Sequence, residues 1–384
     1  MFSRIHIYLL LAGIVLCAIP AHCFVIEYYL YTSTAESNSL PVLKILPSGQ
    51  IVNTGLIYPA GESSPLGFLA DQRMLVVANP FPSFTNGFIT YKINSDFSLT
   101  QLSVSTSTTY AFYINITPNN ELILKSTPYD FEIWSIDSMG IITNTENKFL
   151  GYFITPVRPQ GDIAISPSGG CACDIQVFSI DYNTQSLIST QTILYGGVRK
   201  IVYSRDGKMA VGIGYNIGNT FGGDVALLTI SSTGSVSTTT TILYLGQDFR
   251  DVVFTPDGKY LYLLPYGGST SASIFTLLLN STTTTLQDTG KRFQQISGYG
   301  FVWSIGNLFQ VTPDGKMLVY LYTNSIDNKA WISTAWINDD GSLTWTGYDF
   351  PYQSTFGGTF SIFDMIIVPN YITSIPSELW KEYE

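Results

Sequence analysis

The sequence predicts an all-β fold, a seven-bladed β-propeller, and two features of the chain carry that prediction. The 384 residues include 25 Tyr and 23 Phe but only 12% charged side chains, which favours strands over solvated helices. A strand–turn–strand unit is clearest at residues 251–264, DVVFTPDGKYLYLL, and weaker copies follow one another through the chain. A period of about 40 to 50 residues built from short strands is typical of propeller blades.

Each unit is organised around a tight turn. In the clearest copy, Pro256 fixes φ at the first corner, Asp257 can bond its own backbone, and Gly258 tolerates a positive φ. The residues aligned with Pro256 are Ala70, Pro118, Pro167, Arg205, Pro313 and Pro369. Successive reference positions differ by 48, 49, 38, 51, 57 and 56 residues. The third interval, which spans the fourth blade, is short, so we expect a truncated strand in that blade.

Each unit predicts four strands from the axis outward. In the fifth unit, residues 200–203 are expected to be innermost, followed by 209–214, 224–230 and 237–244. Threonine runs occupy expected outermost strands, as at residues 238–241. Threonine is both β-branched and polar, which suits a solvent-facing rim.

The two ends of the chain complete each other. Residues 25–31 match a second strand and lack an innermost one before them, whereas residues 363–370 match an innermost strand with no unit after it. We therefore expect the C-terminal strand to complete the first blade, which closes a ring of seven blades. The propeller is assigned to residues 24–371, and residues 372–384 are assigned to a C-terminal tail.

Residues 1–23 read as a signal peptide. Arg4 supplies a positive start, residues 7–16 form a short apolar run, and residues 21–23 form a small-residue cleavage region. An uncleaved membrane anchor and a lipoprotein are the alternatives. We expect a secreted, extracellular or periplasmic protein whose mature chain does not insert into a membrane.

The histidine content and net charge of the mature chain exclude some classes of function. Both histidines, His6 and His22, lie in the leader, and loss of Arg4 leaves 17 basic and 28 acidic residues, a net charge of −11. This charge opposes nucleic-acid binding, which requires Lys and Arg to neutralise phosphates. Cys171 and Cys173 remain, and we interpret them as small buried strand residues rather than as a redox pair.

The mouth of the central channel, where innermost strands begin, is the expected site. Five residues before the residue aligned with Pro256, three blades have a carboxylate. In two blades, the fifth and the sixth, an arginine comes directly before this position. The residues expected to meet there are Tyr113, Asp162, Arg199, Lys200, Arg250, Asp251 and Asp364. Three carboxylates facing one space suit a hard cation such as Ca²⁺. Ion pairs that neutralise one another around a wet channel are the alternative.

Two segments carry a resemblance to a known family. Residues 254–262, FTPDGKYLY, and 311–319, VTPDGKMLV, resemble the repeats of YVTN-type seven-bladed propellers, which include 6-phosphogluconolactonase-like proteins. Lactonase-like members often carry an Arg-His pair just before the innermost strand. This chain keeps the arginines, Arg199 and Arg250, and has Lys200 and Asp251 in place of the histidine. Ester hydrolysis ordinarily uses a base with a pKa near neutrality, which histidine supplies.

Two functions from different classes follow. We favour a monomeric, non-catalytic binding or surface module without a cofactor, whose rigid disc presents one face to a small molecule or a protein. The alternative is a lactonase-like hydrolase that uses the carboxylates and arginines at the mouth, together with a divalent cation.

Overall fold

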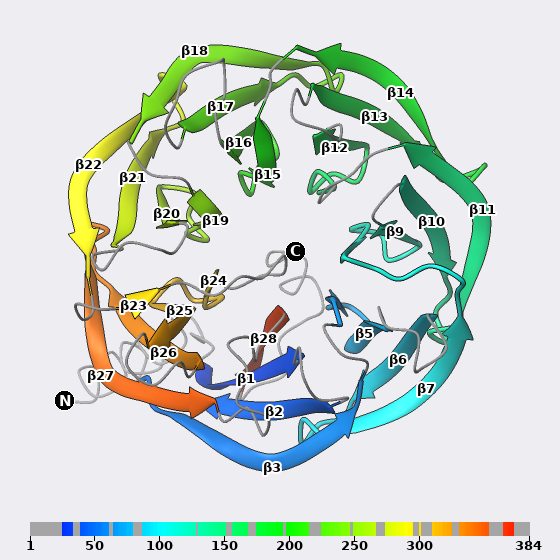
Figure 1. The fold of residues 1–384 in the computed structure, drawn as a ribbon, viewed down its shortest axis with the longest axis horizontal. Coiled ribbons are helices and arrows are strands. Elements are labelled where there is room, and N and C mark those ends of the chain that lie inside the picture. Colours follow the sequence, from blue (N-terminus) through cyan, green and yellow to red (C-terminus); the bar gives the residue numbers. More distant parts are fainter. Residues whose placement is uncertain are drawn as a thin grey trace, which may run out of the picture.

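A computed structural model describes residues 25–371 apart from the segments 34–38, 61–63, 80–86, 128–129, 151–155, 168–173, 195–196, 215–223, 246–248, 266–272, 295–298, 301–308, 325–329 and 353–363. The predicted leader, the predicted tail, Cys171 and Cys173 lie outside the described residues. The described chain forms seven antiparallel sheets around a central axis (Figure 1). The prediction of a seven-bladed β-propeller is therefore confirmed.

The first four blades contain these strands, in order from the axis outward. Blade 1 contains β28 (Asp364–Tyr371), β1 (Val25–Ser33), β2 (Ser39–Ile45) and β3 (Ile51–Pro59). Blade 2 contains β4 (Leu66–Leu69), β5 (Met74–Asn79), β6 (Gly87–Ile93) and β7 (Leu99–Thr106). Blade 3 contains β8 (Tyr113–Ile116), β9 (Leu122–Ser126), β10 (Asp130–Ile136) and β11 (Ile142–Leu150). Blade 4 contains β12 (Ile163–Pro167), β13 (Ile175–Asp181) and β14 (Ser186–Ile193).

The last three blades follow the same plan. Blade 5 contains β15 (Val198–Tyr203), β16 (Met209–Gly214), β17 (Asp224–Ile230) and β18 (Val236–Tyr244). Blade 6 contains β19 (Phe249–Phe254), β20 (Tyr260–Pro265), β21 (Ile274–Asn280) and β22 (Thr285–Phe293). In blade 7, β23 (Tyr299–Gly300) and β24 (Phe309–Val311) both pair with β25 (Met317–Asn324), which is followed by β26 (Ala330–Ile337) and β27 (Leu343–Tyr352).

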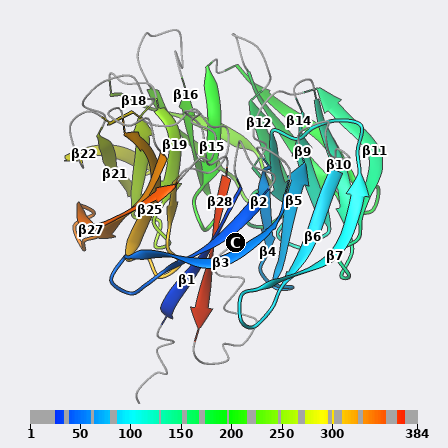
Figure 2. The ribbon, with the colours of Figure 1, turned by 60° about the horizontal axis from the view of Figure 1, so that its bottom comes forward.

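The ends of the chain close the ring as predicted. β28 pairs with β1 in antiparallel register, with Tyr29 opposite Val368 and Thr32 opposite Met365. Figure 2 shows the two strands, red and blue, side by side. Met365 and Val368 are fully buried. The C-terminal strand therefore contributes to the core of the first blade.

The core lies between the blades. The second strands β16 and β20 are buried along their whole length, because neighbouring sheets cover both of their faces. The outermost strand β3 instead alternates between half-buried and exposed residues after Ile51, as expected for a strand with one solvated face. None of the described residues forms a helix suited to crossing a bilayer.

Every outermost strand contains a β-bulge opposite its neighbour. In six of the seven blades a threonine of the bulge donates its hydroxyl to a carbonyl oxygen of the third strand. These threonines are Thr54, Thr145, Thr190, Thr239, Thr289 and Thr346. The hydroxyl thus satisfies a carbonyl group that the bulge removes from the ladder.

The fourth blade differs from the prediction, because its turn lies eight residues earlier than expected. The backbone N–H of Arg158 donates to the carbonyl oxygen of Ile163 (2.9 Å), and that of Gly161 donates to the carbonyl oxygen of Arg158 (2.7 Å). The same two bonds close the sixth-blade turn at residues 255–260. Pro159 therefore holds the turn reference position, and the assignment of Pro167 to it is wrong.

The corrected turn makes β12 the second strand of its blade. The described part of the innermost strand contacts it through a single bridge between Val157 and Ala164. With Pro159 as the reference position of the fourth blade, the distances to the neighbouring reference positions, Pro118 and Arg205, are 41 and 46 residues. The short interval that led us to expect a truncated strand therefore disappears. The sequence was ambiguous because Pro167 precedes a serine and two glycines, which also resemble a turn.

Gly341 joins two blades, and its replacement tests how closely they pack. It lies in the turn between β26 and β27, has φ of +79°, and accepts hydrogen bonds from the hydroxyls of Tyr262 (3.2 Å) and Thr276 (3.3 Å) of blade 6. A Cβ atom at this position would lie 2.6 Å from ring carbons of Tyr260. We expect Gly341→Ala to lower the unfolding free energy by about 3 kcal/mol, from backbone strain and overpacking together.

Urea denaturation of the variant measures this loss. Gly290→Ala is the matched control, since Gly290 has φ of +73° but no atom within 4 Å of a built Cβ. It should lose only the strain contribution, about 1 kcal/mol. Equal losses in the two variants would show that the contact between Gly341 and Tyr260 is not tight.

Candidate functional site

Lys200 and Asp251 form a buried ion pair between neighbouring blades. Lys200 lies in β15 and Asp251 in β19, and the distance from Lys200 Nζ to Asp251 Oδ1 is 2.5 Å. Both side chains are almost fully enclosed. The same Asp251 oxygen accepts the N–H of Val252 (2.7 Å). The geometry agrees with the self-neutralising alternative at this position.

Asp364 connects the first two blades. At the start of β28, its Oδ1 accepts the N–H of Met365 (2.9 Å), and its Oδ2 accepts the N–H of Leu66 in β4 (2.9 Å). Asp364 is fully buried. Its carboxylate, like that of Asp251, therefore ties the beginnings of adjacent innermost strands together.

Asp162 lies at the opposite end of the innermost strands. Its backbone oxygen accepts the N–H of Ile180 (3.0 Å), the bond that Lys259 accepts from Leu279 (2.9 Å) in blade 6. Asp162 is thus the last residue of a turn, and its side chain pairs with Arg158 at 2.9 Å. Asp162 therefore does not lie near Asp251 and Asp364, as the sequence predicted. The prediction was wrong because the turn of the fourth blade had been aligned eight residues too late in the sequence.

The remaining predicted residues, Arg199, Arg250 and Tyr113, do not share one environment in the described structure. Arg199 is half-buried in β15, and the side chain of Arg250 lies outside the described part of the structure. Tyr113 is buried at the start of β8. In the part of the chain that the structure describes, no three His, Cys, Asp or Glu side chains gather as a metal site would require.

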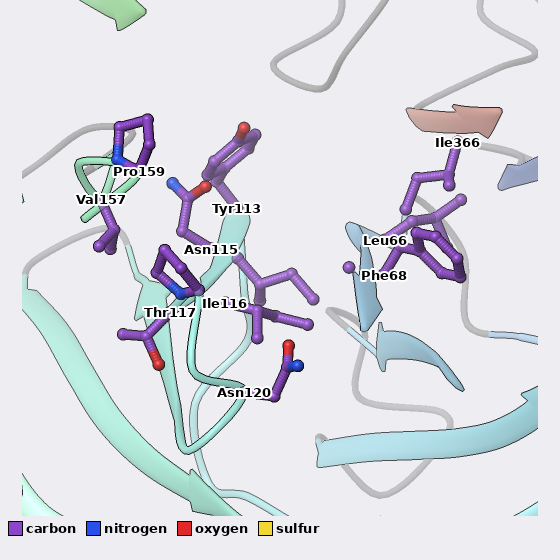
Figure 3. A pocket seen from close by; sticks show the side chains of 13 residues that line it. Leu66, Phe68, Tyr113, Asn115, Ile116, Thr117, Asn120, Val157, Pro159 and Ile366 are labelled. Carbon is purple, nitrogen blue, oxygen red and sulfur yellow. The ribbon is translucent and has the colours of Figure 1, made fainter. Parts of the chain in front are cut away.

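Tyr113 lines a cavity of about 260 Å³ in the central channel. Its walls come mainly from β4, β8 and the turn that follows β8, with one residue from β28. In Figure 3, Tyr113 and Asn115 project from one wall, while Leu66 and Phe68 lie across the cavity from them. The described residues of the lining include no Asp, Glu, Lys, Arg or His. We call this space the β8 cavity.

The wall of the β8 cavity combines hydrogen-bonding and apolar groups. Tyr113, Asn115 and Asn120 supply hydroxyl and amide groups, whereas Leu66, Phe68 and Ile366 supply hydrocarbon. Such a mixture suits a small ligand with polar edges and an apolar face. Of the six predicted site residues whose side chains the structure describes, only Tyr113 lines this cavity.

Blade 3 contains a buried ionic cluster that sequence reasoning missed. Lys125 Nζ donates to the Oγ of Ser107 (2.7 Å) and to the backbone oxygen of Thr109 (2.7 Å), and it lies 3.3 Å from Glu132 Oε2. The other oxygen of Glu132 accepts from Lys148 at 2.8 Å. The available signal was a Lys and a Glu inside otherwise apolar strands, LILKS and DFEIW.

The cluster shifts the pKa values of its members. Burial lowers the pKa of Lys125 to about 8, although the nearby charge of Glu132 acts in the opposite direction. Burial also acts to raise the pKa of Glu132, but the hydrogen bond from Lys148 and the charge of Lys125 bring it down to about 2. Both side chains are enclosed, so we interpret the cluster as structural.

Comparisons with known proteins support the fold. No protein-family model matches the chain, and no curated protein sequence matches it. A Bacteroides uniformis structure provisionally named a 6-phosphogluconolactonase superposes with a TM-score of 0.71 at 17% identity, covering 89% of this chain and 100% of the other. The periplasmic gluconolactonase of Pseudomonas aeruginosa gives 0.67 at 16% identity, covering 89% and 99%.

At such identities a structural likeness shows the fold and leaves the activity open. A Bacteroides fragilis protein, also provisionally named a 6-phosphogluconolactonase, gives a TM-score of 0.69 at 17% identity over 91% of this chain and 99% of its own. The chain is a seven-bladed β-propeller whose structural neighbours include proteins named for 6-phosphogluconolactonase and gluconolactonase activity.

Proposed function

We propose that the protein is an exported, non-catalytic binding module that holds a small uncharged ligand of monosaccharide size in the β8 cavity. The single observation that carries this proposal is the lining of that cavity, which joins hydroxyl and amide groups to apolar walls and, among the residues that the structure describes, includes no charged side chain. Export rests on the leader-like residues 1–23.

The size of the β8 cavity restricts the ligand. Its volume of about 260 Å³ lies just below the range of about 300 to 1,000 Å³ usual for small-molecule pockets. A sugar or a sugar lactone is small enough, and its ring has hydroxyls at the edge and C–H groups on the faces. Tyr113 and Asn115 can bond the hydroxyls while Phe68 contacts a face of the ring.

The charge of the lining disfavours phosphorylated ligands. A phosphate monoester carries close to two negative charges, and proteins usually bind it with Arg, Lys or a row of backbone N–H groups. The lining residues of the β8 cavity that the structure describes include no Arg or Lys. We therefore favour a neutral sugar or lactone over its 6-phosphate.

Lactone hydrolysis is the second candidate, because the similar Pseudomonas aeruginosa structure is named a gluconolactonase. Hydrolysis requires a general base within hydrogen-bond reach of the attacking water. In the part of the β8 cavity wall that the structure describes there is no carboxylate, histidine or lysine, and the Lys200–Asp251 pair is enclosed. These observations support binding over hydrolysis.

Calorimetric titration of the purified protein with glucose, glucono-δ-lactone and glucose 6-phosphate tests the binding proposal. We expect the neutral ligands to bind and the phosphate to bind at least about tenfold more weakly, because its charge would be desolvated without a partner. Tyr113→Phe should weaken binding of the neutral ligands about two- to tenfold, the usual value of one hydrogen bond. Tyr348→Phe is the control, since Tyr348 lies on the outermost strand β27 and is 39% exposed.

Lactone turnover separates the two candidates. The assay follows acid release from glucono-δ-lactone with and without the protein. We expect the rate with the protein to equal the rate of the buffer blank. Acceleration above the blank that is lost in Asp251→Asn would replace the binding proposal with the hydrolase. Preferential binding of glucose 6-phosphate, or equal binding by the Tyr113→Phe variant, would show that the ligand does not occupy the β8 cavity.

A further inference from the structure

The chain contains two N-x-T triplets, at residues 115–117 and 280–282, which match the acceptor pattern for N-linked glycans. A pattern this short also occurs by chance, so the surroundings of each asparagine decide whether it can carry a glycan. Attachment requires an amide nitrogen that faces solvent, a hydroxyl two residues further on, and room outside the fold for a bulky sugar chain.

Asn280 lies at an exposed hairpin turn. It is the last residue of β21, and residues 281–284 connect β21 to β22 towards the circumference of blade 6 (Figure 1). Asn280, Ser281 and Thr282 are all exposed. The side-chain oxygen of Asn280 accepts the N–H groups of Thr282 and Thr283, both at 3.0 Å. Because this oxygen faces the backbone of the turn, the amide nitrogen on the other side of the group faces outward.

The same turn position in other blades shows what the fold itself requires there. It directly follows the third-strand residue whose N–H bonds the end of the inner turn. The corresponding residues are Asn94, Asp137, Asp181, Ser231 and Asn338. The aspartates make the same kind of bond, since Asp137 accepts the N–H of Met139 (2.9 Å) and Asp181 accepts that of Asn183 (2.9 Å). A side-chain oxygen therefore suffices for the turn, and the amide nitrogen of Asn280 is not needed for it.

The other two asparagines at this position use their amide nitrogens within the turn. The nitrogens of Asn94 and Asn338 each donate to two hydroxyls of their own hairpin, at 2.9 and 3.0 Å. Neither asparagine begins an N-x-S or N-x-T triplet. No described residue accepts a hydrogen bond from the amide nitrogen of Asn280. The triplet thus coincides with the asparagine whose nitrogen the hairpin leaves available.

The triplet at residues 115–117 has the opposite surroundings. Asn115 belongs to the innermost strand β8 and lines the β8 cavity. Thr117 is fully buried, and its hydroxyl donates to the side-chain oxygen of Asn119 (2.7 Å) and accepts the N–H of Leu122 (3.0 Å). A glycan on Asn115 would have to occupy the central channel, so we expect the folded protein to carry none there.

We propose that Asn280 is an N-glycosylation site, modified when the chain is exported through a compartment that contains an oligosaccharyltransferase. A lipid diphosphate oligosaccharide is the donor. A bond forms between the amide nitrogen of Asn280 and the anomeric carbon of the first sugar, and the bond from that carbon to the diphosphate oxygen breaks. The diphosphate leaves with the electron pair, and the nitrogen gives up one proton to a base of the transferase. This inference rests on the export part of the proposed function and is independent of the β8 cavity.

Secretion of the full chain from insect cells, with its own residues 1–23, tests the site. We expect the secreted protein to exceed the mass of the polypeptide by a single glycan, and a peptide N-glycosidase to remove the excess. Peptide mapping by mass spectrometry should find the glycan on the peptide that contains Asn280. The peptide that contains Asn115 should be unmodified.

Three variants identify the groups responsible. Asn280→Asp keeps the oxygen that the turn needs, as Asp137 and Asp181 do in their blades, so it should fold and lose the glycan completely. Thr282→Val removes the hydroxyl and should also lose it. Asn94→Asp, at the same turn position of blade 2, is the control and should keep the glycan. Urea denaturation of the deglycosylated proteins checks that all three variants fold.

The site would be disproved by a secreted chain without a glycan, by a glycan that persists in Asn280→Asp, or by one on the peptide that contains Asn115. If the chain is not secreted with its own residues 1–23, an established signal peptide replaces them. A glycan on Asn280 in that fusion would support the site and contradict export by residues 1–23. Secretion of the fusion without a glycan would contradict the site itself.

Discussion

A chain that ends before residue 364 is expected to lose cooperative folding. Removal of β28 takes three buried apolar side chains, Met365, Ile367 and Val368, from the first blade and exposes the edge of β1. At about 1.5 to 3 kcal/mol for each buried side chain, the loss approaches the whole stability of a typical domain, about 5 to 15 kcal/mol. The carboxylate of Asp364, which holds Leu66 of the next blade, is removed as well.

Urea denaturation followed by tyrosine and tryptophan fluorescence measures the effect of this truncation. A chain that ends after residue 371 is the matched control, because it keeps all of β28 and lacks only the predicted tail. We expect a cooperative transition for the control and none for the shorter chain. A cooperative transition of similar midpoint in both chains would mean that β28 is not needed to close the ring.

Glu132→Gln is expected to lower the unfolding free energy by about 3 to 5 kcal/mol, the usual cost of breaking a buried ion pair. The change leaves the ammonium of Lys125 enclosed without its counter-charge, and Lys148 also loses its partner. Asp206→Asn is the control, since Asp206 and Lys208 are exposed and 3.9 Å apart, and little change is expected there. If Lys125→Met is added to Glu132→Gln, it should recover part of the loss.

The pH dependence of stability provides a second measurement of the Glu132 effect. The pKa of Glu132 is about 2 in the folded protein, against an ordinary value of 4.5. A lowered carboxyl pKa contributes stability above pH 4.5, and this contribution is lost as the pH falls from 4.5 towards 2. The difference in unfolding free energy between the parent and Glu132→Gln should therefore shrink over this interval. A constant difference would show that the carboxylate charge is not what stabilises the cluster.

The fold could be predicted because its information is local and repeated. The TPDGK turns of blades 6 and 7 define the repeat to which the other turns are aligned. The mismatch between the two ends of the chain implies that β28 completes blade 1. The prediction failed where local signals competed: Pro167 with its following glycines resembled a turn more than Pro159 did. The backbone hydrogen bonds of Arg158 and Gly161 distinguish the two.

The candidate site was less predictable because it depends on three-dimensional placement. Counting back from the turns correctly brought Lys200 near Asp251, since both residues stand at the same level of adjacent blades. The same count misplaced Asp162 by the length of an innermost strand. The neutral lining of the β8 cavity and the burial of Lys125 depend on how neighbouring blades pack, which no repeat pattern records.

The bulges of the outermost strands bear on how the protein behaves at high concentration. A straight strand with unpaired N–H and C=O groups is a template on which another molecule can add a strand, and a propeller presents one such edge for every blade. Here each edge is bent, and threonine hydroxyls already occupy carbonyl groups behind it. The circumference of the disc should therefore resist the intermolecular strand addition that begins fibril growth.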